Sequence, residues 1–589
     1  MNTRPVLSER ASLSAFMNAL WREWSPAKRL PAENSNLSGQ DGTLCLPLTR
    51  PEGVLQVPLQ YFSLSGRHRF DGTVHFVPAG GPAFAIDFAQ TVSLLAGEPA
   101  LAPDIDDSTR RRFLLRVLDS AATLLDADAD HQAPSWPDAG FLAAEQGLVY
   151  GHAVHPTPKS RDEFTREDHI RYSPDFGGHT PLVWFAVQAG ALWQARPGSS
   201  FLPDALITSD PGLSTMMTRY PHSEGWQWLP VHPWQAGVLR RAPAYHHWRS
   251  RDALIDLGEA GTDWFPTSSL RTLYSPHAPA MLKFSLSVRI ANSRRVLRMD
   301  EVMRGQLVRD IFSSKQGKAL RHRCPTLGIL HEHGALALTT LDGHPLAESF
   351  VIFRDNPFPP DCTSYVMATL YQEGANGTAS MVSRLIVDLA AQEQRPLTLL
   401  AMEWFDCFLS VALKPLLIAQ ADYGFLFSAH QQNTVLTLKS GWPAGIWLRD
   451  GQGAAFHPET IAELTGQIPG IRSASTLAFN ETMANHLLGY YLIVNNVLSL
   501  IATLGADGLV DEMRLAERLR HSLLALRRTS PRFPHFIDYL LDSPMLMSKG
   551  NFMLSLRGLD ETANPEDSFR SYVPLRNPIA AAANPESHH

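Results

Sequence analysis

The chain has 589 residues, 44% hydrophobic and 19% charged, which are ordinary fractions for a globular protein and argue against extensive disorder. This length exceeds one hydrophobic core, so two to four domains are expected. The formal net charge of −7 gives no overall electrostatic reason to bind nucleic acid or an anionic membrane.

The first 140 residues are predicted to form a mixed N-terminal region. Its elements follow from apolar residues at helical spacing and from short β-like runs: helices over residues 13–24 and 110–126, and strands over residues 43–48 and 54–62. In the second helix, Leu125 is expected to face the core. The acidic, proline-containing stretch 126–140 has no periodicity and therefore predicts a domain boundary.

The middle third of the chain is rich in proline, tryptophan and histidine and contains several β-like runs. Residues 281–290 alternate apolar and polar side chains, with Lys283 on the polar face, which predicts one half-buried antiparallel strand. Residues 229–235 suggest no catalytic or binding role, so we expect them to pack at the base of a cleft. Prolines within residues 354–361 forbid regular structure and predict a second boundary.

From about residue 364 onward the chain is predicted to be mainly helical. Four long segments have apolar residues at helical spacing: 379–392, 397–421, 482–504 and 513–528. A β-like insertion over residues 433–450 interrupts them.

The most apolar stretches, residues 408–426 and 487–504, are interpreted as buried helices rather than membrane spans. Each is interrupted by polar or helix-breaking residues, Lys414-Pro415 in the first and Asn495-Asn496 in the second. The N-terminus lacks the apolar stretch of a secretion signal, and the four cysteines form no C-x-x-C pair. A cytoplasmic, reducing location is therefore expected.

The strongest local signal is the segment PTSSLRT at residues 266–272, which is followed by Lys283 and by Arg294-Arg295. Short hydroxyl donors, the planar fork of an arginine and the compact charge of a lysine suit a triphosphate. Taken alone, a solvated turn beside an edge strand is the simpler interpretation of this segment.

A second cluster of polar residues surrounds the β-like insertion. His430 and Gln432 precede Asn433, and a predicted hairpin then leads to Asp450. Such a hairpin can bring Asn433 and Asp450 together, and Mg²⁺ accepts amide and carboxylate oxygens when it also binds nucleotide phosphates. The imidazole and the Gln432 amide either satisfy a turn or hydrogen-bond a carboxylate or an incoming nucleophile.

A third group is GHAVHPTPK at residues 151–159. Histidines at i and i+3 suggest a metal, but the prolines make the segment extended and no third ligand is near. A rigid loop that presents His152, His155 and Lys159 toward an anion is the favoured interpretation, with plain loop structure as the alternative. The chain contains no P-loop, nucleophile elbow, H-E-x-x-H helix or dinucleotide fingerprint.

Together and in this order, these segments resemble the NRPS-independent siderophore (NIS) synthetases, the aerobactin-synthetase-like IucA/IucC family. The resemblance rests on six motifs: G-H-x-x-H-P-x-x-K at 151–159, L-P-V-H-P-W-Q at 229–235, S-S-L-R-T at 268–272, Lys283 with Arg295, H-x-Q-N at 430–433 and L-R-D at 448–450. The motifs span about residues 140–455, and the order of elements agrees over the rest of the chain.

The resemblance implies an α+β fold shaped as a cupped hand. Residues 1–140 would form an N-terminal thumb, residues 141–360 fingers with an antiparallel sheet and the phosphate-binding segment, and residues 361–589 a mainly helical palm with the metal and carboxylate loop. A homodimer is compatible with this family.

The resemblance also implies ATP and Mg²⁺ in a central cleft, adenylation of a polycarboxylate such as citrate, and capture of the acyl group by an amine or alcohol with release of AMP and pyrophosphate. The residues implied to bind ATP are Ser268, Ser269, Arg271, Thr272, Lys283, Asn433 and Asp450, with Asn433 and Asp450 also holding the metal. The residues implied to bind the carboxylate are His155, Lys159, Arg295, His430 and Gln432, of which His430 and Arg295 are the catalytic candidates.

Three positions depart from the family pattern, which often has Pro at Ala153, Thr at Ala291 and Glu at Ser428. Two of them are expected to border the carboxylate pocket, so the identity of the carboxylate is left open. Two other functions also stay open. One is a small-molecule kinase or acyl-phosphate ligase that releases ADP, and the other is a non-enzymatic siderophore- or metal-binding protein that uses the 23 histidines.

Overall fold

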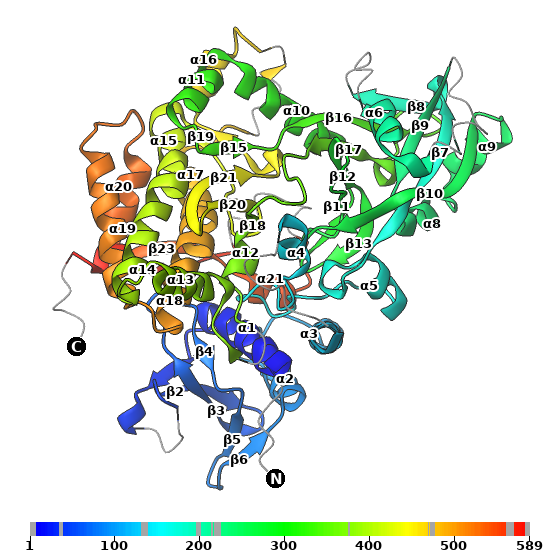
Figure 1. The fold of residues 1–589 in the computed structure, drawn as a ribbon. Coiled ribbons are helices and arrows are strands. Elements are labelled where there is room, and N and C mark those ends of the chain that lie inside the picture. Colours follow the sequence, from blue (N-terminus) through cyan, green and yellow to red (C-terminus); the bar gives the residue numbers. More distant parts are fainter. Residues whose placement is uncertain are drawn as a thin grey trace.

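The computed structural model describes residues 7–34, 39–130, 140–195, 202–213, 216, 225–374, 377–468, 470–471, 477–560 and 571–583. Helices and mostly antiparallel sheets are mixed through the molecule (Figure 1), so the predicted α+β class is confirmed. The predicted region boundaries at residues 140 and 360 stay predictions.

The N-terminal region packs helices on one sheet. Its strand order is β1-β2-β3-β5-β6 with β4 beside β3: β1 Lys28–Leu30, β2 Thr43–Thr49, β3 Glu52–Tyr61, β4 Arg69–Phe70, β5 Val74–Pro78 and β6 Phe84–Ile86. The helices are α1 Leu7–Glu23, α2 Phe88–Gly97 and α3 Asp107–Asp130. The predicted helices and strands of this region are thus confirmed.

Two details of α3 differ from the prediction. The helix continues to Asp130, so the boundary stretch begins later than residue 126, and most of that stretch lies outside the described residues. Leu125 is 49% exposed whereas Leu124 is fully buried. The predicted inward residues Phe113 and Val117 are buried, so the buried face differs from the prediction only toward the end of the helix. Tertiary packing and not spacing alone selects which side chains are buried there.

The middle region is built on an eight-stranded sheet with the order β8-β16-β17-β12-β11-β10-β7-β9. Its strands are β7 Thr180–Gln188, β8 Leu192–Ala195, β9 Trp226–Val231, β10 Leu254–Pro266, β11 Thr272–Tyr274, β12 Ala280–Phe284, β16 Glu332–Leu338 and β17 Val351–Asp355. Trp184 and Trp228 are the largest side chains buried in its core. The motif at residues 229–235 runs from β9 into α8 (Pro233–Leu239) and serves packing, since His232 and Gln235 are buried.

The single strand predicted over residues 281–290 is wrong. The chain breaks at Ser285, and the second half, β13 (Leu286–Ile290), pairs with β14 (Ser293–Arg295) in a separate hairpin. Every residue of β12 is buried, including Lys283, and the strand lies between β17 and β11 in the sheet. An alternating pattern thus conceals a buried lysine, which requires charged partners nearby.

The C-terminal half is mainly helical, which was predicted from residue 364 onward but not for the two helices before that residue. Its principal helices are α10 Met299–Ser313, α11 Lys315–Arg323, α13 Met381–Gln392, α14 Leu397–Phe408, α15 Lys414–Tyr423, α17 Glu481–Leu488, α18 Leu498–Ala506, α19 Glu512–Arg527 and α20 His535–Asp542. The predicted β insertion is the hairpin of β20 (Thr434–Lys439) and β21 (Trp442–Leu448), and it lies in the sheet β15-β21-β20-β18. β15 spans Leu327–Ile329 and β18 spans Ser364–Val366.

The apolar stretches predicted as buried helices are helical. Within the described residues, one helix is long and apolar enough to cross a membrane: Glu481–Ala506, with a mean hydropathy of 1.7 and 89% of its apolar window buried inside the protein. The pair Met381–Gln392 and Leu397–Tyr423 passes the same test only jointly and is bent by 118°. Burial of this extent is typical of core helices.

A short helix near the C-terminal end packs against the first helix of the chain. The short helix α21 (Asn551–Leu556) lies against α1, with the Phe16 and Phe552 rings 5.1 Å apart. The Glu23 carboxylate accepts hydrogen bonds of 2.6 and 2.8 Å from the backbone N–H groups of Phe552 and Met553 at the start of α21. The N-terminal region is therefore attached to the C-terminal half (Figure 1).

Candidate active site

A cavity of about 330 Å³ lies where the middle region, the C-terminal half and the loop of residues 151–159 meet. Ten of the predicted site residues line it: His155, Lys159, Ser268, Ser269, Arg271, Arg295, His430, Gln432, Asn433 and Asp450. The other two, Thr272 and Lys283, lie behind its wall, where β11 and β12 pair them in register. Segments far apart in sequence thus converge on one site.

The loop that carries Ser268, Ser269 and Arg271 is a tight turn between β10 and β11. Leu270 adopts a φ of +61°, in the left-handed region that residues other than glycine rarely occupy. The Ser269 hydroxyl accepts a hydrogen bond of 3.3 Å from the Thr272 backbone N–H, which closes the turn. This turn directs its serines and the arginine into the cavity, whereas the Thr272 side chain is buried.

Asp450 and the buried Lys283 form the electrostatic centre of the wall. The Lys283 ammonium lies 2.7 Å from an Asp450 carboxylate oxygen and 3.3 Å from Glu332, and Arg354 lies 2.7 Å from the same Glu332 oxygen. Burial alone raises the pKa of Asp450, but Lys283, Arg354 and Arg271 outweigh it and hold this pKa well below its usual range. Asp450 is therefore ionised at neutral pH.

The hairpin brings Asn433 and Asp450 side by side, as predicted. β20 and β21 pair Thr434 with Leu448, and the Arg449 backbone N–H donates to the Asn433 carbonyl at 3.0 Å. An amide oxygen and a carboxylate on one rim fit the hard oxygen ligands of Mg²⁺. No group of three or more His, Cys, Asp or Glu side chains suited to a metal occurs among the described residues, so further ligands would come from phosphates and water.

The loop of His430 is held by the long C-terminal helix. Between α17 and α18 this helix passes through a π-helical segment, Gly489–Val497, of a kind often found at functional sites. Asn495 accepts from the Gln431 backbone N–H at 3.1 Å, and Asn496 donates to the Ala429 carbonyl at 2.8 Å. The two asparagines that interrupt the apolar stretch thus position the loop.

His430 lines the cavity in an environment that favours its neutral form. Burial lowers the pKa of His430 to about 3, and the nearby Asp450 only partly opposes this effect. The ring of Tyr491 lies 5.5 Å away, centroid to centroid. A neutral imidazole can accept a hydrogen bond or a proton from an incoming group.

Glu145 is a site residue that sequence reasoning missed. It is fully buried in α4 (Phe141–Gln146), forms an ion pair with Arg449 and accepts the Ser268 backbone N–H at 2.8 Å. Arg449 in turn donates to the Ser268 hydroxyl at 2.8 Å, and the Gln432 amide donates to the Ser268 carbonyl at 2.7 Å. This network ties the serine loop to the hairpin; Gln432 is turned toward that loop.

The loop of residues 151–159 is not helical, as predicted, but it is a series of turns and bends rather than an extended segment. Lys159 lines the cavity, and its ammonium donates to the Leu148 carbonyl at 2.6 Å and lies 3.2 Å from Asp175. Asp175 also binds Arg161 at 2.6 Å, and Arg161 lines the cavity too. Burial lowers the pKa of Lys159 to about 8, against the opposing effect of Asp175.

The comparisons with known proteins identify the family. Residues 140–372 match the IucA / IucC family, and residues 402–564 match a family described as ferric iron reductase FhuF-like transporter. The N(2)-citryl-N(6)-acetyl-N(6)-hydroxylysine synthase of Vibrio mimicus is 33% identical to this chain over 97% of it and 95% of that protein. The chain belongs to the IucA/IucC family of siderophore synthetases.

Two further relatives agree. The rhizobactin siderophore biosynthesis protein RhbC of Rhizobium meliloti is 33% identical over 91% of this chain and 93% of its own length. The ATP-bound structure of aerobactin synthetase IucA from Klebsiella pneumoniae matches with a TM-score of 0.87 and 30% identity, covering 97% of this chain and 99% of that one. The predicted resemblance is therefore confirmed across the whole length.

The positions that depart from the IucA/IucC pattern lie in different surroundings. Ala291 lines the cavity with a φ of +51°. The Ser428 hydroxyl donates to the Gly453 carbonyl at 2.7 Å and Ser428 is not among the lining residues. Ala153 lines a second, smaller hollow next to the cavity.

Sequence reasoning also missed several lining residues of this IucA/IucC family member. They are Asn292, Tyr490, Tyr491, Lys549 and Asn551, in addition to Arg161 and Asn495. The asparagine pair in an apolar helix was a usable signal for Asn495. Lys549 and Asn551 come from the C-terminal end of the chain and stand in no motif, so only the tertiary fold brings them to the site.

Proposed function

We propose that this family member is an ATP-dependent ligase that activates a carboxylate of citrate as an acyl-adenylate and condenses it with an amine. The observation that carries the proposal is the convergence of Arg271, Arg295, Asn433 and Asp450 on one cavity, with Lys283 paired to Asp450 behind its wall. Relatives named as citryl-hydroxylysine synthase and spermidine-citrate ligase, and a solved relative described as ATP-bound, support the choice of substrates.

ATP supplies a leaving group that a carboxylate lacks. A carboxylate oxygen of citrate attacks the α-phosphorus, the bond to pyrophosphate breaks, and a mixed anhydride forms. Two polyanions must be held together for this step, so the cations Arg271, Arg295 and Lys283 offset their repulsion. Ser268 and Ser269 supply short hydrogen-bond donors for the phosphates.

Mg²⁺ would bind Asn433 and Asp450 and neutralise phosphate charge. Asp450 suits this role because its cationic neighbours keep it ionised. Glu332 stays behind it as a second partner for Lys283 and Arg354. The lysine therefore keeps a buried counter-ion if Asp450 turns toward a metal.

The second step joins the amine to the acyl group. The amine nitrogen attacks the carbonyl carbon, a proton leaves the nitrogen, and AMP departs. His430 is neutral at physiological pH and lines the cavity, so we assign it to orient the amine or accept this proton. We place the reaction in the cytoplasm, consistent with four free cysteines.

Product analysis tests the proposal. The protein is incubated with ATP, Mg²⁺ and a panel of citrate, succinate and 2-oxoglutarate, each with and without amines, and the nucleotides are separated by ion-exchange chromatography. AMP and pyrophosphate formed with citrate are expected. ADP and phosphate instead would favour the kinase or acyl-phosphate ligase, and stoichiometric metal uptake without ATP turnover would favour a binding protein.

A further inference from the structure

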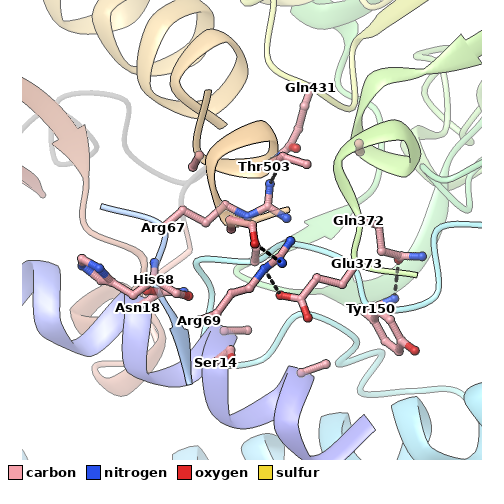
Figure 2. Close-up of a pocket in the computed structure, with 17 residues that line it drawn as sticks. Ser14, Asn18, Arg67, His68, Arg69, Tyr150, Gln372, Glu373, Gln431 and Thr503 are labelled. Carbon is pink, nitrogen blue, oxygen red and sulfur yellow. Dashed lines mark hydrogen bonds and ion pairs between the residues drawn. The ribbon is translucent and has the colours of Figure 1, made fainter. Parts of the chain in front are cut away.

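A second hollow, of about 50 Å³, lies directly beside the catalytic cavity. The two share three wall residues: Gly151, Ala368 and Gln431. The hollow is enclosed by α1, the segment before β4, the loop at Tyr150 and the C-terminal helix α18 (Figure 2). The other two hollows described, at residues 312–447 and 206–278, share no wall residue with the cavity.

Two acidic side chains near the hollow are already paired. Glu373 binds Arg69 at 3.0 Å and Arg10 at 3.2 Å. Asp507 binds Arg69 at 2.8 Å and also accepts the Ser380 hydroxyl at 2.6 Å. These contacts hold Arg69 with two carboxylates on the wall of the hollow.

Arg67 is close enough to Glu373 and Asp507 to be stabilised by their charge, but it contacts neither of them in a described ion pair. Its guanidinium donates to the Thr503 hydroxyl at 3.0 Å and to the Tyr371 carbonyl at 2.9 Å, which are neutral acceptors, and it forms no ion pair with any described residue. In Figure 2 the guanidinium groups of Arg67 and Arg69 both lie at the middle of the hollow. The guanidinium groups of Arg10, Arg67 and Arg69 thus surround only two carboxylates, those of Glu373 and Asp507, so this cluster has a net positive charge. An arginine fork matches a carboxylate.

The size of the hollow fits one small anionic group. A single water needs roughly 10–15 Å³ of such space, so about 50 Å³ holds a few heavy atoms, as in a carboxylate with its neighbouring carbon. In the proposed reaction the amine must reach an acyl group in the catalytic cavity. The remainder of the amine substrate then has to extend into adjoining space, and this hollow adjoins it.

We propose that this hollow binds a carboxylate of the amine substrate, with Arg67 as its binding residue, so that the nucleophile is an amino acid or an amino-acid derivative rather than a plain polyamine. The inference rests on the proposed function, since it assigns the nucleophile of that same reaction. Arg67 and Ser14, from two sides of the hollow, would together set this specificity.

Matched amine pairs test the specificity of the wild-type protein. Lysine with cadaverine, ornithine with putrescine, and 2,3-diaminopropanoate with ethylenediamine each differ by one carboxylate. Formation of the citryl amide is followed by mass spectrometry. A charge-assisted contact predicts that kcat/KM is about ten- to a hundred-fold higher for the acids. Equal or better use of the diamines would overturn the inference.

Variants test the residue itself. Arg67→Gln keeps amide donors for Thr503 and Tyr371 but removes the charge, so the KM for the amino acids should rise about tenfold or more. The KM for the diamines and the rate of citrate-dependent pyrophosphate release should be unchanged. Ser14→Leu places a larger side chain in the hollow and keeps Arg67. It should also raise the KM for the amino acids, and it tests the hollow if Arg67→Gln does not fold. Arg112→Gln, on the exposed face of α3, is the matched control.

The outcomes separate this inference from the proposed function. If citrate supports pyrophosphate release but both variants lose activity equally with the amino acids and the diamines, only the proposed role of the hollow is overturned. If no carboxylate supports pyrophosphate release, calorimetric titration of the wild type and Arg67→Gln with the amino acids still decides. Binding that Arg67→Gln weakens supports the hollow, and equal binding or none overturns it. If the variants instead change the KM for citrate, the hollow binds citrate and not the amine substrate, which contradicts the inference.

Discussion

At the scale of single residues, the wall of the cavity contains buried charged side chains that are stable only because they form ion pairs with one another. Lys283 and Glu332 are each 2% exposed, and Arg354 and Asp450 complete their set. Such a set is stable only as a whole, because removal of one partner leaves another charge buried and unpaired. Of these four residues, Asp450 lines the cavity proposed to hold the phosphates and the other three lie behind it. Stability and activity therefore depend on the set in different ways.

Lys283→Met tests this difference. Loss of the ammonium should lower the free energy of unfolding by about 3–5 kcal/mol, because Glu332 loses a buried partner. The double variant Lys283→Met/Glu332→Gln should regain most of that stability in chemical denaturation and still fail to release pyrophosphate. Recovery of activity along with stability would mean that Lys283 has only a structural role.

His430 should matter more for the second half-reaction than for the first. His430→Ala removes the neutral imidazole, so acyl transfer to the amine should slow about 10²–10⁴-fold while ATP–pyrophosphate exchange with citrate changes much less. Single-turnover measurements of each step decide. Equal losses in both steps would instead indicate that His430 binds the carboxylate.

Lys159 predicts a pH effect on substrate binding. Its pKa of about 8 means that the ammonium is present below this pH and lost above it. The KM for citrate should therefore rise about tenfold between pH 7 and pH 9, and Lys159→Met should show a high KM without this slope. Because the folded pKa lies below the ordinary 10.5, the folded state binds fewer protons between these values, and stability should increase with pH in that window. A wild-type KM that is flat with pH contradicts the role.

At the scale of elements, the site depends on where regular structure is interrupted. The strand break at Ser285 separates the buried Lys283 from the hairpin that carries Arg295. The π-helical segment Gly489–Val497 directs Asn495 and Asn496 to the loop of His430. Each interruption is a small cost in local hydrogen bonding that orients side chains toward the cavity.

Asn496→Leu should show that the helix positions the loop. It leaves the Ala429 carbonyl and the Tyr371 hydroxyl without their present partner, at about 1–3 kcal/mol each, and should raise the KM for ATP and citrate. Tyr371→Phe removes only the second contact and is the control: it should lower the melting temperature slightly and leave KM unchanged. Similar kinetics for both variants would exclude a positioning role for Asn496.

At the scale of the whole molecule, the hydrophobic cores of the N-terminal, middle and C-terminal parts are separate, and the cavity lies where polar loops from these parts converge. The IucA/IucC relatives cover almost the whole chain, as a site assembled from distant segments requires. The fold itself is held by these cores and by charge pairs within the protein, and the described residues include no group of three or more His, Cys, Asp or Glu side chains suited to a metal.

Removal of divalent ions should therefore affect activity alone. With EDTA, pyrophosphate release should stop, because Asn433 and Asp450 no longer share an ion with the phosphates, and added Mg²⁺ should restore it. The melting temperature should stay the same, since Asp450 is paired with Lys283 in the metal-free protein. A lower melting temperature in EDTA would indicate a structural metal.

The sequence by itself determined the class of elements, the family and ten of the residues that line the cavity. The class of elements can be predicted from helical spacing and short β-like runs, which are local features of the sequence. The family can be predicted from motifs in a fixed order, which include Arg271, His430, Asn433 and Asp450. The tertiary structure alone decided which faces are buried, as at Leu124 and Leu125, and which distant residues reach the cavity. The reason is physical: residue spacing shows only whether a side chain is apolar or charged. Burial and ion pairing depend on contacts between segments hundreds of residues apart. Such contacts bring Lys549 to the cavity, Arg67 to the second hollow and Glu145 to the serine loop.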